Sequence, residues 1–379
     1  MLFIHRWLGF ISGLVVFIVS ITGCLFCFQD EIQDALYSYR HVIPQHLPYV
    51  APSVIKANAL KLYPGKTADY TYYYGKDRPA LVFVNMAPGK FRYIYLNPYT
   101  GQVLHQEDPE KNFFVVVENI HLYLLLPAQA GQLVVGTSVL IFVVLIITGI
   151  VLWWPKRKKD RKRSFTIKWN GRWRRVNYDL HNVLGFYATS VALILAVTGL
   201  AIAFNWVREG IYKTTNLGHQ YVSEKSFPVS DTLNYSVKAN SPAIDRAFDA
   251  ALHQSPSAQM FLIGEDERKV GTISITAYAQ SLNFGHSDYY YFDKYTGKQL
   301  KSLPYSQKSA GLKLNDLNYD IHVGQVAGFT GKVIAFLASL ICASLPVTGF
   351  MVWLGKRKNP KRKKLQHVID RRVAKGMLN

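Results

Sequence analysis

The sequence HRWLGFISGLVVFIVSITGCLFCF, residues 5–28, determines the architecture expected for this chain. A histidine and an arginine precede a run, 7–28, that has no charged side chain. A run of this length crosses a hydrocarbon core of about 30 Å when it is helical. It therefore predicts a membrane span with His5 at one end.

Three more uncharged runs of similar length lie at 133–154, 182–206 and 333–354. Helices of soluble proteins keep a polar face, so four such runs disfavour a soluble fold. The 379-residue chain is therefore expected to cross a membrane four times. The expected segments are transmembrane helix 1 (1–28), a first outer domain (29–120), transmembrane helix 2 with a preceding histidine segment (121–155), a basic loop (156–180), transmembrane helix 3 (181–206), a second outer domain (207–321), transmembrane helix 4 with a preceding histidine segment (322–355) and a basic tail (356–379).

The net charge of +20 is concentrated in two segments. Residues 156–175 and 356–379 together contribute +19, and each segment directly follows an apolar span. Basic runs of this kind occur in nucleic-acid-binding proteins, but the positive-inside rule explains their position better. We therefore expect the lipid bilayer and no nucleic acid as a partner, both termini in the cytoplasm, and the two outer domains on the opposite side.

All three cysteines fall inside the spans, so no disulfide framework is expected in the outer domains. Cys24 and Cys27 have the spacing of a redox pair, but they are also neighbouring apolar positions of a helix. Unbridged cysteine is commonly buried, which favours packing over redox chemistry here.

The two halves of the chain resemble each other. At an offset of 176, His5 aligns with His181, and Thr22-Gly23 aligns with Thr198-Gly199. At an offset of 200, Thr148-Gly149 aligns with Thr348-Gly349, and the following Trp and basic residues also match. Two repeats of the same sense are expected, related by an axis along the membrane normal. The Thr-Gly pairs are interpreted as sites of close helix packing.

Each outer segment has the pattern of an α+β domain. Helices are predicted at 52–63 and 242–253, each followed by alternating, Tyr-rich strands. The strands are predicted at 69–75, 80–86, 91–97, 102–106, 258–263, 270–276, 288–293 and 298–302. YLNPYTGQVL (95–104) and YFDKYTGKQL (291–300) contain hairpin turns with glycine in the left-handed position. Tyrosines 72–74 and 289–291 are either ligand contacts or, as alternation favours, cross-strand packing.

Four histidines are tied to the spans and form two repeat-related pairs. His5 and His181 stand at the predicted cytoplasmic ends, whereas His121 and His322 precede spans 2 and 4 on the outer side. Two imidazoles that face each other across a gap are the ligands of a bis-histidine b-type haem. Gly9 and Gly185 follow their histidines on the same helical face and leave room for a flat ring. Gly324 lies near His322 in the same way.

Other roles for these histidines remain open. An isolated histidine at a helix end commonly bonds water or lipid, but two repeat-related pairs favour a shared function. Zinc is disfavoured because no carboxylate or Cys-x-x-Cys pair completes a tetrahedral set. Copper lacks a soft-ligand pathway, and a metal-ion transporter would need polar residues at mid-span.

The duplicated Tyr-Thr-Gly hairpins, the His-x-x-Leu-Gly starts, the Thr-Gly pairs and the Trp-then-basic span ends resemble PepSY-associated transmembrane proteins. This family includes iron-regulated inner-membrane proteins and FoxB-like siderophore reductases. The resemblance implies a membrane α+β fold with four spans, two periplasmic PepSY-like domains and a bacterial inner-membrane location. It also implies two b-type haems, and by position their iron ligands would be His5 with His181 inside and His121 with His322 outside.

The implied function is transfer of electrons through two haems b to a ferric siderophore in the periplasm, with release of Fe(II). The electron donor is unknown, and a siderophore transporter is a candidate partner. The alternative is a non-redox PepSY membrane protein that binds peptide or siderophore, or that serves as an accessory subunit of a permease.

Overall fold

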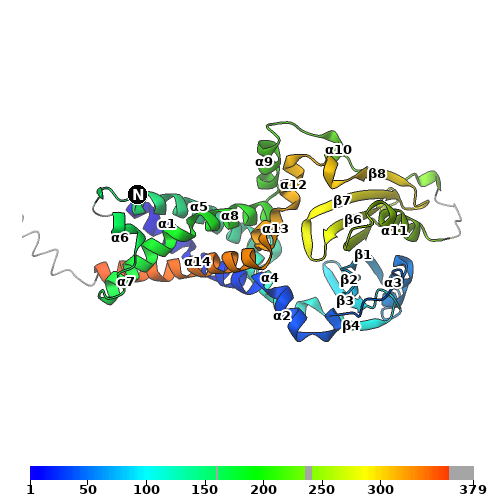
Figure 1. Ribbon diagram of the computed structural model, residues 1–379, viewed down its shortest axis with the longest axis horizontal. Helices are drawn as coiled ribbons and strands as arrows, with labels where there is room; N and C mark the ends of the chain where they lie inside the picture. The colour runs from blue at the N-terminus through cyan, green and yellow to red at the C-terminus, as the bar shows by residue number, and fades with distance from the viewer. Residues whose placement is uncertain (159–160, 235–240, 358–379) are drawn as a thin grey trace, which may run out of the picture. The chain divides into compact units, whose positions relative to one another are not determined.

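The computed structural model describes residues 1–158, 161–234 and 241–357 (Figure 1). The chain divides into two compact units, and each is described by itself. The membrane unit contains Met1–Cys24, Ile120–Leu200 and the chain from Ile334 onward, and the sheet unit contains Leu25–Asn119 and Ala201–Val333. Most of the predicted basic tail, 358–379, lies outside the described residues.

In the described part of the chain, four helical segments are long and apolar enough to cross a membrane, as predicted. The first is α1 (Leu2–Cys27), and the second is α5 (Ala128–Trp153). The third, Trp173–Ala203, joins α7 (Trp173–Asp179), η4 (Leu180–Leu184) and α8 (Gly185–Ala203). The fourth is Gln325–Gly355, formed mainly by α14 (Gly328–Arg357). The third span begins at Trp173 rather than at 181, so it takes in the end of the predicted basic loop, which also contains α6 (Arg161–Phe165).

The segment before α5 is a separate helix, α4 (Phe113–Tyr123). Between the two helices, Leu124 and Leu125 have φ angles of 55° and 59°, in the left-handed region. Pro127 then precedes α5 and is compatible with a helix start. Gly131 is required at this bend because a Cβ there would lie 2.3 Å from the Tyr123 carbonyl oxygen.

The sheet unit contains eight strands and several short helices, and the predicted strands agree with it within a few residues. The strands are β1 (Thr67–Tyr73), β2 (Ala80–Ala87), β3 (Lys90–Leu96), β4 (Val103–Glu107), β5 (Met260–Glu265), β6 (Thr272–Gln280), β7 (Asn283–Asp293) and β8 (Gln299–Leu303). The helices are α2 (Gln29–Leu36), η1 (Ser38–Arg40), α3 (Pro52–Leu60), η2 (Pro109–Lys111), α9 (Asn205–Thr215), α10 (Val222–Lys225), η5 (Thr232–Asn234), α11 (Ala243–Gln254), η6 (Tyr305–Gln307), α12 (Ala310–Asp316), α13 (Asn318–His322) and η7 (Gln325–Ala327).

The strands of both predicted outer domains form one antiparallel sheet with the order β4-β3-β2-β1-β5-β6-β7-β8. The seam is the antiparallel pair β1–β5, in which Tyr72 lies opposite Leu262. An unpaired strand edge exposes backbone N–H and C=O groups. Pairing of β1 with β5 satisfies those groups for the inner edge of each four-strand half.

Helices α3 and α11 cover one face of this sheet (Figure 1). Their apolar side chains pack on a fully buried layer that includes Val82, Ile94, Phe261 and Phe292. The alternating tyrosines divide between the two faces. Tyr73 is buried in this core, and its hydroxyl donates to the Val50 carbonyl at 2.7 Å. Tyr72 and Tyr74, two residues apart in the chain, stack on the opposite face with ring centroids 5.0 Å apart. The Tyr72 ring also lies 5.7 Å from that of Phe83 on the neighbouring strand β2, as cross-strand packing predicts.

A buried ion pair fixes α12 against β7. Lys308 Nζ donates to Asp316 Oδ2 at 2.8 Å and to Ser287 Oγ at 3.1 Å, and the lysine side chain is fully buried. Burial lowers the pKa of Lys308 and raises the pKa of Asp316. Removal of these charges from water costs free energy and offsets much of the attraction between them. The pair therefore holds α12 in place against β7 more than it lowers the free energy of the folded state.

A disulfide can test the β1–β5 seam. Directly opposed residues in an antiparallel pair have Cα atoms about 4.5–5.5 Å apart, within disulfide range. We expect the double substitution Tyr72→Cys/Leu262→Cys to form a cross-link on mild oxidation. The cross-linked peptide is detected by mass spectrometry of a digest under non-reducing conditions.

The matched control is Tyr72→Cys/Ile263→Cys, because Ile263 lies opposite Thr71 and points to the other face. It should remain uncrosslinked. Equal cross-linking of both variants, or of neither, would contradict the register of the seam.

Candidate cofactor site in the membrane unit

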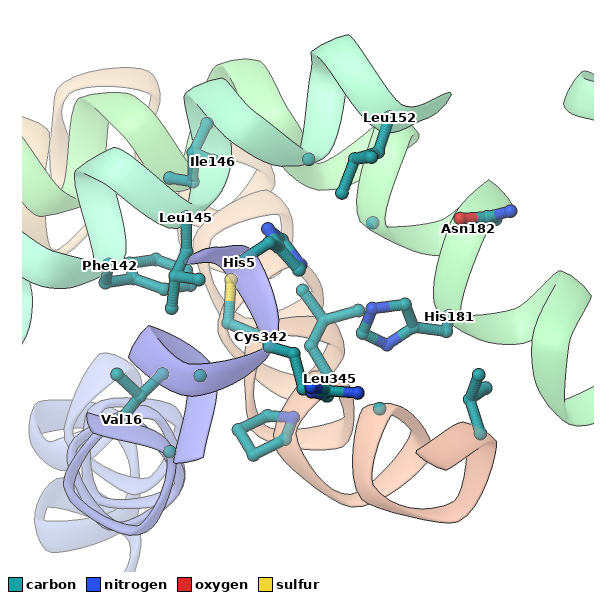
Figure 2. A pocket seen from close by; sticks show the side chains of 18 of the residues that line it. His5, Val16, Phe142, Leu145, Ile146, Leu152, His181, Asn182, Cys342 and Leu345 are labelled. Atoms are coloured by element: carbon teal, nitrogen blue, oxygen red, sulfur yellow. The ribbon is translucent and has the colours of Figure 1, made fainter. Parts of the chain in front are cut away.

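The membrane unit encloses a cavity of about 620 Å³ among its four spans. This volume is in the range of sites for small molecules and cofactors. The wall is mostly apolar and aromatic and includes Phe10, Phe142, Ile146, Trp153, Phe186, Cys342, Leu345, Phe350 and Trp353. Figure 2 shows this cavity with part of its lining.

His5 and His181 both line the cavity, so the structure brings together the predicted inner pair (Figure 2). Their ring centroids are 6.4 Å apart, and their planes make an angle of 83°. An imidazole nitrogen binds a metal ion at about 2.0–2.1 Å, so two imidazoles on opposite sides of one ion have centroids roughly 6.3 Å apart. The observed separation matches the distance between two imidazole ligands of a single metal ion.

The two histidines reach this position from different local structures. His5 lies in the first turns of the regular helix α1. His181 lies in η4, a wide π-helical turn between α7 and α8. A π turn inserts one residue into a helix and changes the direction of the side chains that follow, and such turns are frequent at functional sites. Next to it, Phe186 stacks on Trp153 with ring centroids 3.6 Å apart.

Each histidine is held by a threonine of the span that it packs against. His5 Nδ1 lies 2.8 Å from Thr148 Oγ1, and His181 Nδ1 lies 3.0 Å from Thr348 Oγ1. Asn177 braces the second contact, because its Nδ2 donates to the Thr348 carbonyl at 3.0 Å. The Nε2 atom of each imidazole remains for a ligand in the cavity.

The glycine after each threonine provides space for the imidazole ring. A Cβ at Gly149 would lie 3.5 Å from His5 Cε1, and one at Gly349 would lie 3.0 Å from His181 Cε1. Gly9 and Gly185 line the cavity as predicted, and a Cβ there would approach Leu145 and Leu345. The Thr-Gly pairs, interpreted from the sequence as helix packing, thus also contact the histidines.

The cavity wall includes a cationic group. Arg6 lines the cavity beside His5, and its Nε is buried without a hydrogen-bond partner in the described part of the chain. A buried donor of this kind is normally satisfied by an acceptor. Arg6 is thus available for an anionic group of a bound ligand. The repeat does not indicate this role, because the position that matches Arg6 in the second half is Asn182.

The predicted outer pair is divided between the two units. His121, in α4, belongs to the membrane unit, where its Nδ1 lies 3.1 Å from Thr22 Oγ1 and 3.0 Å from the Val19 carbonyl oxygen. His322, the last residue of α13, belongs to the sheet unit. Their pairing stays a prediction. Gly324 has a φ angle of 81°, and a Cβ there would lie 2.4 Å from the Gly331 carbonyl oxygen, so this tight turn alone requires glycine.

The donor set fits a cofactor-bound metal better than a bare ion. Among the described residues, no group of three or more His, Cys, Asp or Glu side chains is arranged to hold a metal ion. All three cysteines are described, buried and outside any disulfide. A porphyrin supplies the remaining ligands of its iron and needs only two from the protein.

The fold and the site define a multi-pass membrane protein with a two-histidine cavity among its spans and an antiparallel sheet in a separate unit. The chain belongs to the family of the PepSY-associated TM region, whose model matches residues 2–356. A search of curated proteins found no match.

The two glycines against the histidine rings should differ in their tolerance of a methyl group. Alanine favours a helix over glycine by about 0.8–1.0 kcal/mol. We expect Gly149→Ala to keep or raise thermal stability, because its Cβ makes an ordinary contact. Gly349→Ala should lose about 1–3 kcal/mol, as is typical for overpacking. Thermal unfolding of both purified variants in the same detergent measures the difference. Equal midpoints would contradict the close approach at Gly349.

Proposed function

We propose that the chain is a haem b protein of the bacterial inner membrane that carries electrons to a ferric siderophore in the periplasm. The observation that carries the proposal is the His5–His181 pair, with ring centroids 6.4 Å apart at an apolar cavity of about 620 Å³. The family of PepSY-associated TM regions supports a membrane PepSY protein. The haem and the siderophore are our inference.

His5 and His181 would hold the haem iron through Nε2, because their Nδ1 atoms are bonded to threonines. Gly9 and Gly185 leave space beside the ligands. The buried Nε of Arg6 is a suitable donor for a haem carboxylate. When it is bound, haem supplies one-electron redox chemistry.

The chain's own residues supply a dry environment with fixed ligands. Phe10, Trp153 and Phe186 are among the aromatic side chains that line the cavity and would shield a bound haem from water. The apolar surroundings of a redox centre control its solvent access and its reduction potential. Rigid helices, rather than loops, hold both histidines, so little rearrangement is expected on electron transfer.

The second haem would be bound by His121 and His322, as the sequence repeat predicts. The outer domains would contact the ferric siderophore on the periplasmic side, and both termini would be cytoplasmic. In each turnover, a donor loses one electron and the siderophore-bound Fe(III) gains it to become Fe(II). Hydroxamate and catecholate oxygens are hard ligands that suit Fe(III) better than Fe(II), so reduction promotes release of the iron.

Substitution of either inner histidine should remove one of the two haems. We expect His5→Ala and His181→Ala each to lose about half of the haem per chain, because a b-type haem with one axial ligand missing is poorly retained. Reduced-minus-oxidised spectra and haem quantification of the purified chains measure this loss.

The matched control is His253→Ala, because the His253 side chain is 78% exposed in the sheet unit. It should keep the full haem content. A colourless wild-type chain from haem-replete cells would contradict the proposal and favour a non-redox binding protein.

A ferric siderophore should reoxidise the reduced chain. We expect the reduced haem bands of the purified protein to disappear when a ferric hydroxamate or catecholate is added without oxygen, because electrons pass to Fe(III). A chromogenic Fe(II) chelator should detect one Fe(II) per electron lost. Reduced bands that persist with both classes would overturn the siderophore as substrate and leave the haem unaffected.

A further inference from the structure

Each of the four spans contains one of the repeat-related Thr-Gly pairs, at 22–23, 148–149, 198–199 and 348–349, and the fourth span has a further pair at 330–331. In three of these pairs the structure gives a contact between the threonine and a histidine. Thr148 contacts His5, Thr348 contacts His181, and Thr22 contacts His121, all between Oγ1 and Nδ1 at 2.8–3.1 Å. Three equivalent contacts between different helices indicate a common function.

Each threonine hydroxyl has a backbone carbonyl of its own helix as an acceptor, one turn earlier. Thr148 Oγ1 donates to the Val144 carbonyl at 2.9 Å, and Thr348 Oγ1 donates to the Ser344 carbonyl at 2.9 Å. Thr22 Oγ1 likewise donates to the Ile18 carbonyl at 2.8 Å. A hydroxyl has only one hydrogen, so its lone pairs face the imidazole. With the hydroxyl hydrogen on the carbonyl, the imidazole is the donor, and its hydrogen is on Nδ1.

His121 provides independent support for this assignment. Its Nδ1 also lies 3.0 Å from the Val19 carbonyl oxygen. A carbonyl oxygen only accepts hydrogen bonds, so Nδ1 of His121 must carry the hydrogen. The contact with the Val19 carbonyl therefore also places the hydrogen of His121 on Nδ1, and a carbonyl oxygen cannot be the donor.

We propose that the threonine of each of these three pairs is a positioning residue that fixes the tautomer and direction of its histidine. With the hydrogen held on Nδ1, Nε2 presents its lone pair to the haem iron. This inference rests on the proposed haem function. The threonine acts through the imidazole, in the way that partners of metal-bound histidines orient the ring and tune its basicity.

The glycine of each pair also helps to position the histidine. It follows the threonine directly, so the imidazole that bonds the hydroxyl lies across the glycine backbone. The Cε1 atoms of His5, His181 and His121 would lie 3.5, 3.0 and 3.3 Å from a Cβ at the respective glycines. The hydroxyl therefore fixes one edge of the ring, and the glycine provides the space that the ring occupies.

The test compares Thr348→Val with Thr348→Ser. Valine has nearly the same shape but cannot accept a hydrogen bond, whereas serine keeps the hydroxyl. The control is Thr166→Val, because Thr166 is exposed outside the cavity and its hydroxyl donates to the Lys162 carbonyl four residues earlier. Purified full-length chains are titrated with haemin, and the component that His181→Ala removes is followed by optical and EPR spectroscopy and by redox titration.

We expect Thr348→Val to weaken haemin binding at this site by about 10- to 100-fold, as is typical for loss of such a partner. Its low-spin EPR signal should change, because the ring is freer to rotate. Its midpoint potential should rise, because an imidazole without an acceptor at Nδ1 is a weaker donor to Fe(III). Thr348→Ser and Thr166→Val should behave like the wild type.

Two outcomes would overturn the inference, and they are distinguishable. A haem-containing wild type whose affinity, EPR signal and potential are unchanged by Thr348→Val would show that the threonine does not position the ligand. A wild type that binds no haemin would overturn the proposed function itself. If Thr348→Val does not fold, Thr148→Val makes the same change at His5 and is judged by the same three measurements.

Discussion

The hydrogen bond from a histidine Nδ1 to a threonine hydroxyl is the interaction on which the membrane unit depends. It joins α1 to α5 through His5 and Thr148, and it joins η4 to α14 through His181 and Thr348. A buried polar group without a partner is costly in the hydrocarbon region, so these bonds restrict how the spans can pack. They also direct the remaining imidazole nitrogens to the cavity. The same His–Thr hydrogen bonds thus affect both the packing of the spans and the direction of the imidazole rings.

In the sheet unit, a single pair of strands joins the two halves of the chain. Its central seam pairs β1 of the first half with β5 of the second half, through residues about 190 positions apart in the chain. Because α3 and α11 cover the same face, the two halves share one hydrophobic core. The strands of both halves therefore belong to one sheet with one core.

Hydropathy predicted the four spans, and alternation predicted the strands, because both patterns depend on local burial. The inner histidine pair was also predictable, since His5 and His181 begin matching segments. Three features were not predictable from these patterns. The third span begins at Trp173, but the charges of Arg174 and Arg175 lower the hydropathy there, so the start is not recognised from hydropathy. The π turn at His181 has no hydropathy signal, and periodicity identifies the faces of a strand but not its neighbour in a sheet.

The choice of threonine over a carboxylate has a physical reason. A carboxylate bonded to a histidine would be a stronger acceptor, but burial of its charge among membrane helices is expensive. The chain does place a carboxylate two residues before His181, yet Asp179 accepts from Arg175 Nε at 2.7 Å and from the Lys168 backbone N–H. The imidazole instead bonds the neutral Thr348 hydroxyl. This arrangement keeps the histidine and its partner uncharged, and it gives the ring a fixed direction without a second ion to neutralise.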